Sequence, residues 1–307
     1  MQDPEVELVV NLTPPRAHTQ TTLAAIRAGK HVWSEKPLAP TLDEARKILE
    51  AARAADIRVG CAPDTFLGGG LQTSLKLIDD GWIGEPVAAV AMVSEHGYEH
   101  FHPDVHPFYS PGGGPALDLG PYYVTAIVAM LGPVARVNGF GRITFSQRTI
   151  LTGPRCGEPI PVHVPTHVTG ALELESGALV TVLMSWDIWA THLPYIEVYG
   201  TKGSVSVPNP DEFNGLPRLR RAGLEELRQP PPPPGSLPWT DVPLAFDGHG
   251  CRGLGMVDMT EAIRCCHPHR ANEALAFHVL EVLCALTSQD PQTIEIKSRC
   301  ERPAPVS

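Results

Sequence analysis

Three side chains that can handle protons stand at well-marked places in the sequence: Lys36, Asp118 and Tyr122. Lys36 precedes Pro37, which restricts the backbone, and a lysine ammonium group can exchange a proton or stabilise an alkoxide. Asp118 and Tyr122 are four residues apart, so on one helix both would project from the same face. We expect Lys36 to lower the pKa of the Tyr122 phenol while Asp118 orients the pair. This arrangement predicts acid–base chemistry on a hydroxyl group.

The same residues also have purely structural explanations. Lys36 could be a solvated loop residue, and Asp118 could be an aspartate stabilised by the dipole of a helix N-terminus. Tyr122 could be an ordinary core residue, and the neighbouring Tyr123 competes with it for a catalytic role.

Four histidines fall within eleven residues: His96, His100, His102 and His106. Imidazole is a common ligand of transition metals, but prolines interrupt this stretch and no helical register gathers the rings. We therefore expect no metal site. The stretch predicts either a solvated loop or a loop over the active site, in which His102 and His106 bond substrate hydroxyls.

A second group of large side chains follows a predicted strand and ends at His192. Aromatic rings there suit the C–H faces of a sugar or polyol, so we expect His192 to contact substrate. Core packing explains the aromatic members nearly as well. The group consists of Trp186, Asp187, Trp189 and His192.

The first sixty residues predict alternating strands and helices. A strand over 6–12 is almost continuously apolar, as in strands buried on both faces of a parallel sheet. Thr41 and Glu44 have the spacing of a capping box and mark a helix start. The expected order is a strand over 6–12, a helix over 18–28, a strand over 31–34, a helix over 41–55 and a strand over 57–61. This order predicts right-handed crossovers and a parallel sheet.

Residues from 70 onward follow a different pattern, with polar and apolar residues alternating in short runs. Such alternation is typical of an antiparallel sheet with one solvated face. Helices are predicted over 70–80, 117–130, 254–264 and 273–287, and strands over 87–95, 135–143, 168–175, 178–187, 195–199, 204–207 and 293–297. The fold class is therefore α/β, with a parallel sheet followed by an α+β domain built on a large, mostly antiparallel open sheet.

No G-x-G-x-x-G turn occurs near the N-terminus, although a dinucleotide-binding fold opens with a strand, such a turn and a helix. The glycine triplets at 68–70 and 112–114 have other spacing. The strand over 6–12 would stand at a sheet edge without a neighbour. We expect the chain to start in the middle of a fold.

Composition excludes several functional classes. The 307 residues include 24 Lys+Arg and 34 Asp+Glu, a net charge of −10, so no broad positive field for nucleic acid is expected. Apolar runs are too short to span a membrane, and no signal-peptide pattern is present, which favours the cytoplasm. Seven cysteines without C-x-x-C spacing favour reduced thiols. An R-x-x-P-x-x-P pattern at 228–234 arises easily by chance in a proline run, and we expect a surface loop there.

Several motifs resemble the Gfo/Idh/MocA family of NAD(P)-dependent oxidoreductases. The first are T-P-P-x-x-H at 13–18 and G-K-H-V-W-S-E-K-P at 29–37. Later runs agree in order and separation, and together they span essentially the whole chain. They are G-G-G-P-A-L-D-L-G-P-Y at 112–122, I-E-V-Y-G-T-K-G at 196–203, R-G-L-G at 252–255 and P-H-R-A at 268–271.

The resemblance implies two domains. Residues 1–63 would be the remaining part of a Rossmann domain truncated by about 60 residues at its front, and 64–307 a substrate and oligomerisation domain. The open sheet of the second domain would form a homo-oligomer. The cofactor would be NAD or NADP, because the residue that separates them would lie in the missing segment.

The resemblance also implies roles for individual residues. Lys36 would touch both the substrate hydroxyl and the nicotinamide ribose, with Glu35 near the same ribose. The backbone of Thr13 and Pro14 would contact the cofactor, whereas His18 would either do the same or only cap or pack. The family usually has histidine at the position of Tyr122, although tyrosine also occurs there.

The predicted function is hydride transfer between NAD(P) and a hydroxyl or carbonyl of a sugar, polyol or related small molecule. Two alternatives remain open at this point. The chain could be a non-catalytic truncated paralogue that acts as an oligomerisation or interaction module. It could also be an NAD-dependent lyase or glycosidase of the same family.

Overall fold

The N-terminal sheet of the computed structural model consists of three parallel strands in the order β1 (Leu8–Asn11), β2 (His31–Ser34) and β3 (Val59–Cys61). The structure describes residues 1–102, 104–221, 238–246, 250–288 and 292–306, so the proline run lies outside the described residues. Helices α1 (Pro15–Arg27) and α2 (Leu42–Ala55) connect the three strands. The predicted capping box is confirmed, because the Glu44 amide donates to the Thr41 hydroxyl at the start of α2.

The first strand differs from the prediction. β1 spans four residues rather than seven, and it is not buried on both faces. It is the edge of its sheet, where Val10 is 43% and Leu12 is 70% exposed. β3 is the other edge of this sheet but is fully buried, because α6 (Leu254–Arg264) and α7 (Glu273–Leu286) pack against it. What covers an edge strand, rather than its composition, therefore determines its burial.

The second sheet has nine strands in the order β13-β12-β11-β10-β4-β9-β8-β5-β14. Neighbours are antiparallel except for β4 and β9, which run parallel. The strands β12 and β13 and the separate hairpin of β6 and β7 were not predicted. The bounds are β4 (Pro86–Ser94), β5 (Val134–Arg142), β6 (Gln147–Thr149), β7 (Pro159–Pro161), β8 (His167–Leu174), β9 (Leu179–Ser185), β10 (Ile196–Gly200), β11 (Gly203–Val207), β12 (Arg218–Arg221), β13 (Thr240–Asp241) and β14 (Ile294–Glu295).

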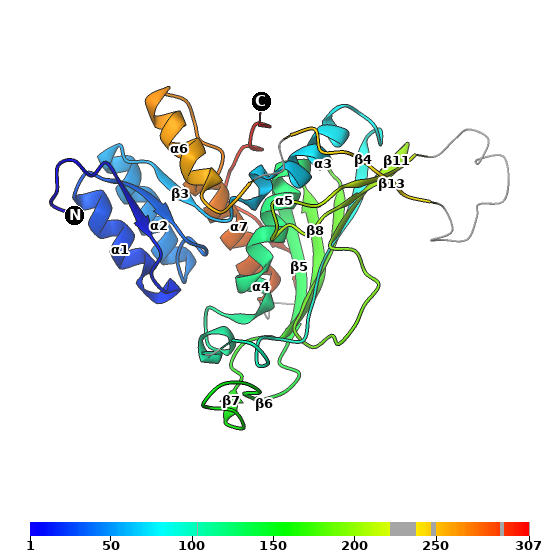
Figure 1. Ribbon diagram of the computed structural model, residues 1–307, viewed down its shortest axis with the longest axis horizontal. Coiled ribbons are helices and arrows are strands. Elements are labelled where there is room, and N and C mark those ends of the chain that lie inside the picture. The colour runs from blue at the N-terminus through cyan, green and yellow to red at the C-terminus, as the bar shows by residue number, and fades with distance from the viewer. Residues whose placement is uncertain (103, 222–237, 247–249, 289–291, 307) are drawn as a thin grey trace.

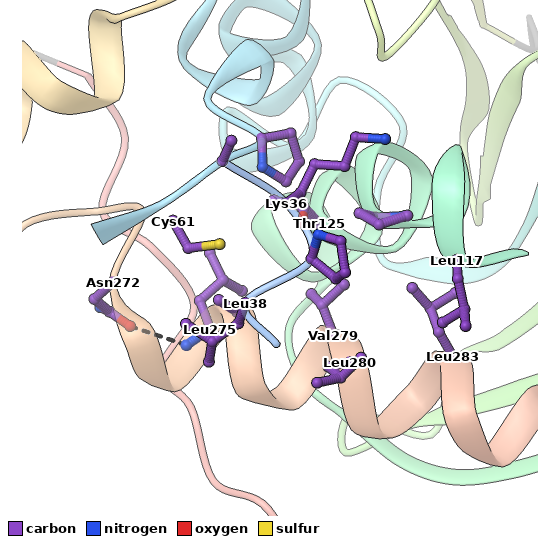
Figure 2. Close-up of a pocket in the computed structure, with 15 residues that line it drawn as sticks. Lys36, Leu38, Cys61, Leu117, Thr125, Asn272, Leu275, Val279, Leu280 and Leu283 are labelled. Carbon is purple, nitrogen blue, oxygen red and sulfur yellow. Dashed lines mark hydrogen bonds between the residues drawn. The ribbon is translucent and has the colours of Figure 1, made fainter. Parts of the chain in front are cut away.

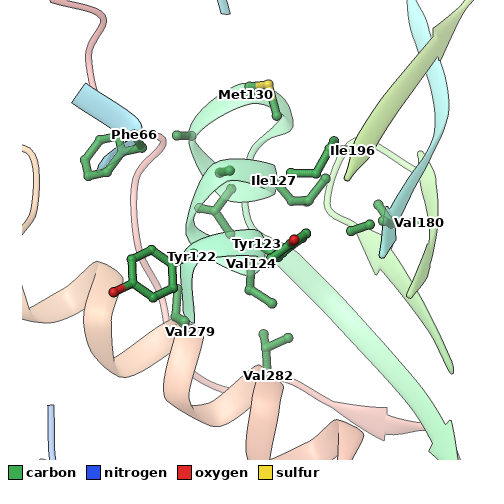
Figure 3. Packing of buried hydrophobic residues seen from close by; sticks show 14 of the residues in the cluster. Phe66, Tyr122, Tyr123, Val124, Ile127, Met130, Val180, Ile196, Val279 and Val282 are labelled. Carbon is green, nitrogen blue, oxygen red and sulfur yellow. The ribbon is translucent and has the colours of Figure 1, made fainter. Parts of the chain in front are cut away.

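Helices cover one face of this sheet (Figure 1). They are α3 (Gly69–Asp79), α5 (Gly120–Leu131) and α7 (Glu273–Leu286), with a 3-10 turn over Thr65–Leu67 before α3. Figure 3 shows α5 between α7 and the strands, with Val124 and Ile127 packed into the space between them. The opposite face carries exposed apolar side chains, including Phe140 at 62% and Leu179 at 56%.

The helix predicted over 117–130 is divided into α4 (Gly114–Asp118) and α5, with Leu119 between them. Pro121 has no N–H to donate, and its ring would clash with the carbonyl four residues earlier in a continuous helix. A Cβ on Gly120 would stand 2.6 Å from a methyl of Leu283, so a close approach to α7 requires glycine at the break. The expectation that Asp118 and Tyr122 share one helix is therefore wrong.

The last two helices return to the N-terminal sheet. Helix α6 (Leu254–Arg264) contacts β3, and α7 contacts both α2 and β5. The Cys61 amide donates to the Ala271 carbonyl (3.0 Å), which connects β3 to the segment between α6 and α7. The division at residue 63 remains a prediction, since α7 packs on both sheets. Among the described residues, no helix is long and apolar enough to cross a membrane.

Candidate active site

Lys36 and Asp118 form an ion pair that joins the small parallel sheet to the segments packed on the large one. Lys36 follows the end of β2, and its Nζ lies 2.7 Å from Asp118 Oδ1 and 2.6 Å from the Asp118 carbonyl oxygen. The two side chains are only 15% and 17% exposed. The break after α4 leaves this carbonyl without a continuing helix, so it can accept from the ammonium group.

Tyr98 completes the surroundings of Asp118, although no sequence pattern pointed to it. Its hydroxyl donates to Asp118 Oδ2 (2.8 Å), on the other oxygen of the carboxylate that holds Lys36. The Tyr98 ring packs against Phe108 and Trp186, with centroid distances of 4.8 Å to each. Nothing in the sequence distinguished this tyrosine from the histidine-rich loop around it.

Tyr122 contacts a second ion pair, between Arg252 and Asp211. Its hydroxyl accepts from Arg252 Nη1 (3.0 Å), and Arg252 Nη2 donates to Asp211 (2.7 Å). A guanidinium group only donates hydrogen bonds, so the Tyr122 hydroxyl keeps its own hydrogen for another acceptor. Arg252 stood in a motif of the resemblance without a role, and Asp211 had no signal at all.

The electrostatics around Tyr122 correct a prediction. Burial raises the pKa of the Tyr122 phenol, Asp211 raises it further, and Arg252 only partly offsets them. Lys36 lies over the ring, 5.4 Å from its centroid, rather than against the hydroxyl. The expected lowering of the phenol pKa by Lys36 is therefore wrong, and Tyr122 is a hydrogen-bond donor at neutral pH.

The position of Arg252 is fixed from the N-terminal sheet. Asp64, which follows β3, accepts from the backbone N–H groups of Gly253 (2.8 Å) and Gly255 (3.0 Å) with one carboxylate oxygen. These two groups belong to the beginning of α6, whose first amides have no partner within the helix. The residue before them is Arg252, so the cap determines where its side chain starts.

Tyr122 and Tyr123 point in different directions. In Figure 3 the Tyr122 ring points away from the large sheet and the Tyr123 ring points toward it. Tyr122 lines a polar cavity together with Lys36 and Asp118, whereas Tyr123 is not among the lining residues of that cavity. The competing assignment to Tyr123 thus has no geometric support.

These groups face one open cavity of about 680 Å³. Its wall combines carboxylates, a lysine, two phenols and imidazoles, which is a surface rich in hydrogen-bonding groups. Burial raises the pKa of the Glu95 carboxyl, and the charges of Asp118 and Asp211 raise it further. The polar lining residues are Lys36, Glu95, His96, Tyr98, His100, His102, Asp118, Tyr122 and Asp211.

The structure separates the three histidines expected to contact substrate. His102 lines the cavity and packs against Phe108 with ring centroids 4.8 Å apart. His106 begins a 3-10 turn (His106–Tyr109) and lies 3.0 Å from Arg155, away from the cavity lining. His192 lines a separate cavity of about 550 Å³. Only His102 of the three is therefore placed with Lys36.

The remaining residues of these two groups have other positions. Trp186 is fully buried, and Asp187 lies behind the cavity wall with 8% of its side chain exposed. Trp189 stacks on His96, whose ring does line the cavity, with centroids 3.3 Å apart. Within the described ranges, no three His, Cys, Asp or Glu side chains gather as a set of metal ligands.

The predicted cofactor-side residues lie at the carboxyl ends of β1 and β2. His18 is fully buried, with Nδ1 2.7 Å from the Pro37 carbonyl and Nε2 2.7 Å from the Thr13 carbonyl. This geometry favours the packing alternative for His18, which ties the turn at Thr13 to the Lys36 loop. Pro14 is exposed beside it, and the Glu35 carboxylate accepts from the Lys36 amide (3.2 Å).

The other side of the Lys36 loop is apolar (Figure 2). A narrow crevice there is lined by Leu38, Val279, Leu280 and other apolar side chains, and the Lys36 nitrogen points away from it. Burial raises the pKa of the Cys61 thiol at this crevice, so that sulfur is not a nucleophile. The polar cavity, not the crevice, carries the groups for proton chemistry.

Comparisons with known proteins agree with this architecture. Residues 1–62 match the family model described as "Oxidoreductase family, NAD-binding Rossmann fold", and 71–206 match "GFO/IDH/MocA C-terminal domain". The 1,5-anhydro-D-fructose reductase of Ensifer adhaerens is 44% identical over 87 residues, which cover 28% of this chain and 26% of that protein. The chain spans between 26% and 47% of the length of the first four curated relatives.

Solved structures share the fold. An NAD binding oxidoreductase from Klebsiella pneumoniae superposes with a TM-score of 0.80 at 21% identity, over 97% of this chain and 82% of that chain. A levoglucosan dehydrogenase in complex with NADH and levoglucosan gives a TM-score of 0.76 at 19% identity, over 96% and 81% of the two chains. The two matched models, the parallel and open sheets and the motifs along the chain together show that this protein belongs to the Gfo/Idh/MocA oxidoreductase family.

Proposed function

We propose that this protein is an NAD(P)-dependent oxidoreductase that acts on a hydroxyl or carbonyl group of a sugar or polyol. The observation that carries the proposal is the partly buried Lys36–Asp118 pair, which faces a polar cavity together with the Tyr122 hydroxyl, whose hydrogen Arg252 does not use. The cavity offers both donors and acceptors, as vicinal hydroxyl groups require. The names of the reductase and of the levoglucosan dehydrogenase, both of which point to sugars, support the same substrate class.

The residues at the carboxyl ends of β1 and β2 fit the nicotinamide end of a dinucleotide. Exposed Pro14 and the turn at Thr13 form a surface beside Glu35 and Lys36. This surface lies at the carboxyl end of the parallel strands, where such sheets bind ligands. We assign the nicotinamide ribose to this surface. When bound, the cofactor supplies or accepts a hydride at nicotinamide C4.

Lys36 handles the proton in this proposal. In the reducing direction its ammonium group gives one proton to the carbonyl oxygen, which becomes the hydroxyl of the product. In the oxidising direction the neutral amine takes that proton back. Asp118 holds the nitrogen in place, and Tyr122 donates a hydrogen bond to the same substrate oxygen as negative charge develops there.

The test compares the protein with its Lys36→Met and Lys76→Met variants. Lys76 is a matched control, because it also forms an ion pair with an aspartate, Asp80, but on the exposed surface of α3. We expect Lys36→Met to lower kcat by about 10³-fold, with sugar binding retained in calorimetry, and Lys76→Met to leave both unchanged. Undiminished turnover in Lys36→Met would refute the proposal. Sugar binding without any turnover by the unmodified protein would favour a non-catalytic module.

We also propose that the uncovered face of the large sheet joins two copies of this chain. Exposed Phe140 and Leu179 on β5 and β9, which both pair with β8, contribute to an apolar surface there, and such surfaces mark interaction sites. Light scattering should give a mass above 33.1 kDa for the protein, and the Phe140→Asp variant should lower it. A monomer in both cases would contradict this assignment.

A further inference from the structure

A buried cluster of charges lies behind the cavity wall. Arg148 Nη1 donates to Glu99 (2.6 Å), and its Nη2 donates to Asp187 and to the Trp186 carbonyl oxygen (2.8 Å). The side chains of Arg148, Glu99 and Asp187 are only 5%, 7% and 8% exposed. Burying a cation and two carboxylates is costly, so simple packing does not explain the choice of residues.

The cluster joins three segments that are far apart in the sequence. Arg148 stands on β6, Asp187 follows β9, and Glu99 lies in the segment after β4, between the cavity-lining residues Tyr98 and His100. The Tyr109 hydroxyl donates to the second Glu99 oxygen (2.5 Å), at the far end of the same segment. A planar guanidinium group can hold several such partners in fixed directions, which a lysine ammonium group cannot.

Arg148 determines the position of Tyr98 from two sides. Glu99, which accepts from Arg148, is the next residue after Tyr98. Trp186, whose carbonyl accepts from Arg148, supports the Tyr98 ring at 4.8 Å. The Tyr98 hydroxyl then reaches Asp118, which holds Lys36.

We propose that Arg148 is a positioning residue, which places the Tyr98 hydroxyl on Asp118 and thereby fixes Lys36 in the cavity. It acts through Tyr98 and does not line the cavity itself. The kinetic aspect of this proposal rests on the proposed function, whereas the placement of Tyr98 does not.

A double-mutant cycle separates positioning from general stabilisation. Arg148→Lys keeps the charge but loses the planar, several-donor geometry of the guanidinium group. Arg46→Lys is the matched control, since Arg46 pairs with Asp43 on the exposed surface of α2. We expect Arg148→Lys to lower kcat by no more than Tyr98→Phe does, about 3- to 10-fold, with little change in KM, and to have no further effect on kcat in a Tyr98→Phe background. Its effect on the melting temperature should be the same in both backgrounds. Additive losses of kcat, or none, would overturn the proposal.

Fluorine NMR tests the placement without any assay of activity. The protein is labelled with fluorotyrosine at its 6 tyrosines, and the Tyr98 resonance is assigned by its loss in Tyr98→Phe. Arg148→Lys should shift this resonance and Arg46→Lys should not. If Arg148→Lys does not fold, Glu99→Gln weakens the same contact and should shift it. An unshifted Tyr98 resonance refutes the positioning role, whereas a shift in a protein without turnover refutes only the proposed function.

Discussion

Two tyrosines face the same cavity, each next to an ion pair, but their hydrogen bonds run in opposite directions. Tyr98 donates to Asp118 of the Lys36 pair, so its hydrogen is already used. Tyr122 accepts from Arg252 of the Asp211 pair, so its hydrogen remains available. The sequence cannot distinguish such roles, because it shows only two tyrosines and not the partners that folding brings to them.

Burial raises the pKa of both phenols, and the neighbouring aspartates raise them further. Neither tyrosine is therefore a base at neutral pH. Tyr98 orients a carboxylate, whereas Tyr122 can donate to a substrate oxygen. The difference teaches that the partner of a tyrosine, more than its burial, decides what it can contribute to catalysis.

Among variants that keep Lys36, the largest effect is expected from Asp118→Asn, which removes the carboxylate shared by Tyr98 and Lys36. The amide of asparagine cannot balance the ammonium charge, so we expect kcat to fall about 100-fold while the fold is kept. Steady-state kinetics and circular dichroism would measure both. Asp80→Asn, which breaks the exposed pair with Lys76, is the control and should change neither. A kcat within about twofold of the unmodified protein would contradict a role for the pair.

Tyr122→Phe sharpens the comparison by removing the available hydroxyl. The substrate oxygen loses one hydrogen bond as its charge develops, so kcat should fall by about 10- to 100-fold. Tyr123→Phe is the matched control on the next residue, because its ring points toward the sheet. Equal losses in both variants would show that packing, not donation, is responsible.

Tyr98→Phe should have a smaller effect, about 3- to 10-fold on kcat, because Lys36 and Asp118 keep their direct contact. Asp118 then loses one donor but remains paired. A loss greater than that of Tyr122→Phe, measured in the same assay, would reverse the two roles assigned above.

The smallest effect concerns Glu95, for which no ion pair or side-chain hydrogen bond is found within the described ranges. Its pKa is raised in the folded protein. Just above its ordinary titration range, the folded protein therefore still binds a proton at this carboxyl that the unfolded chain has lost. The charged form therefore destabilises the protein at neutral pH, and this penalty disappears in acid, where the carboxyl is protonated in both states. We expect Glu95→Gln to raise the melting temperature slightly at neutral pH and not in acid. A lower melting temperature at neutral pH would contradict this.

The sequence was sufficient for much of the fold, because the patterns involved are local. Apolar runs and the capping box at Thr41 predicted the parallel strands and α2, and alternation predicted the strands of the large sheet. The break between α4 and α5 was missed, although Gly120 and Pro121 mark it. The short strands β12 and β13 were missed because their residues have no alternation of their own. β12 depends on pairing with β11, and β13 on pairing with β12.

The candidate site was only partly predictable. Lys36, Asp118 and Tyr122 were identified from residue type, spacing and resemblance, and the structure brings all three to one cavity. Tyr98 and Asp211 were missed, because only the folded chain brings them beside Asp118 and Arg252. The direction of the Tyr122 hydrogen bond also depends on Arg252, which lies 130 residues away in the sequence.

The cap that Asp64 makes on the first turn of α6 has a mechanical consequence. It attaches Arg252 to the same small sheet that carries Lys36, whereas the carboxylates of Asp118 and Asp211 are carried by segments of the large sheet. A hinge motion between the sheets would therefore separate both cations from both anions. The two ion pairs therefore act together to hold the sheets in their relative positions. Added salt would weaken the more exposed Arg252–Asp211 pair more than the Lys36–Asp118 pair, because salt screens exposed charges most strongly.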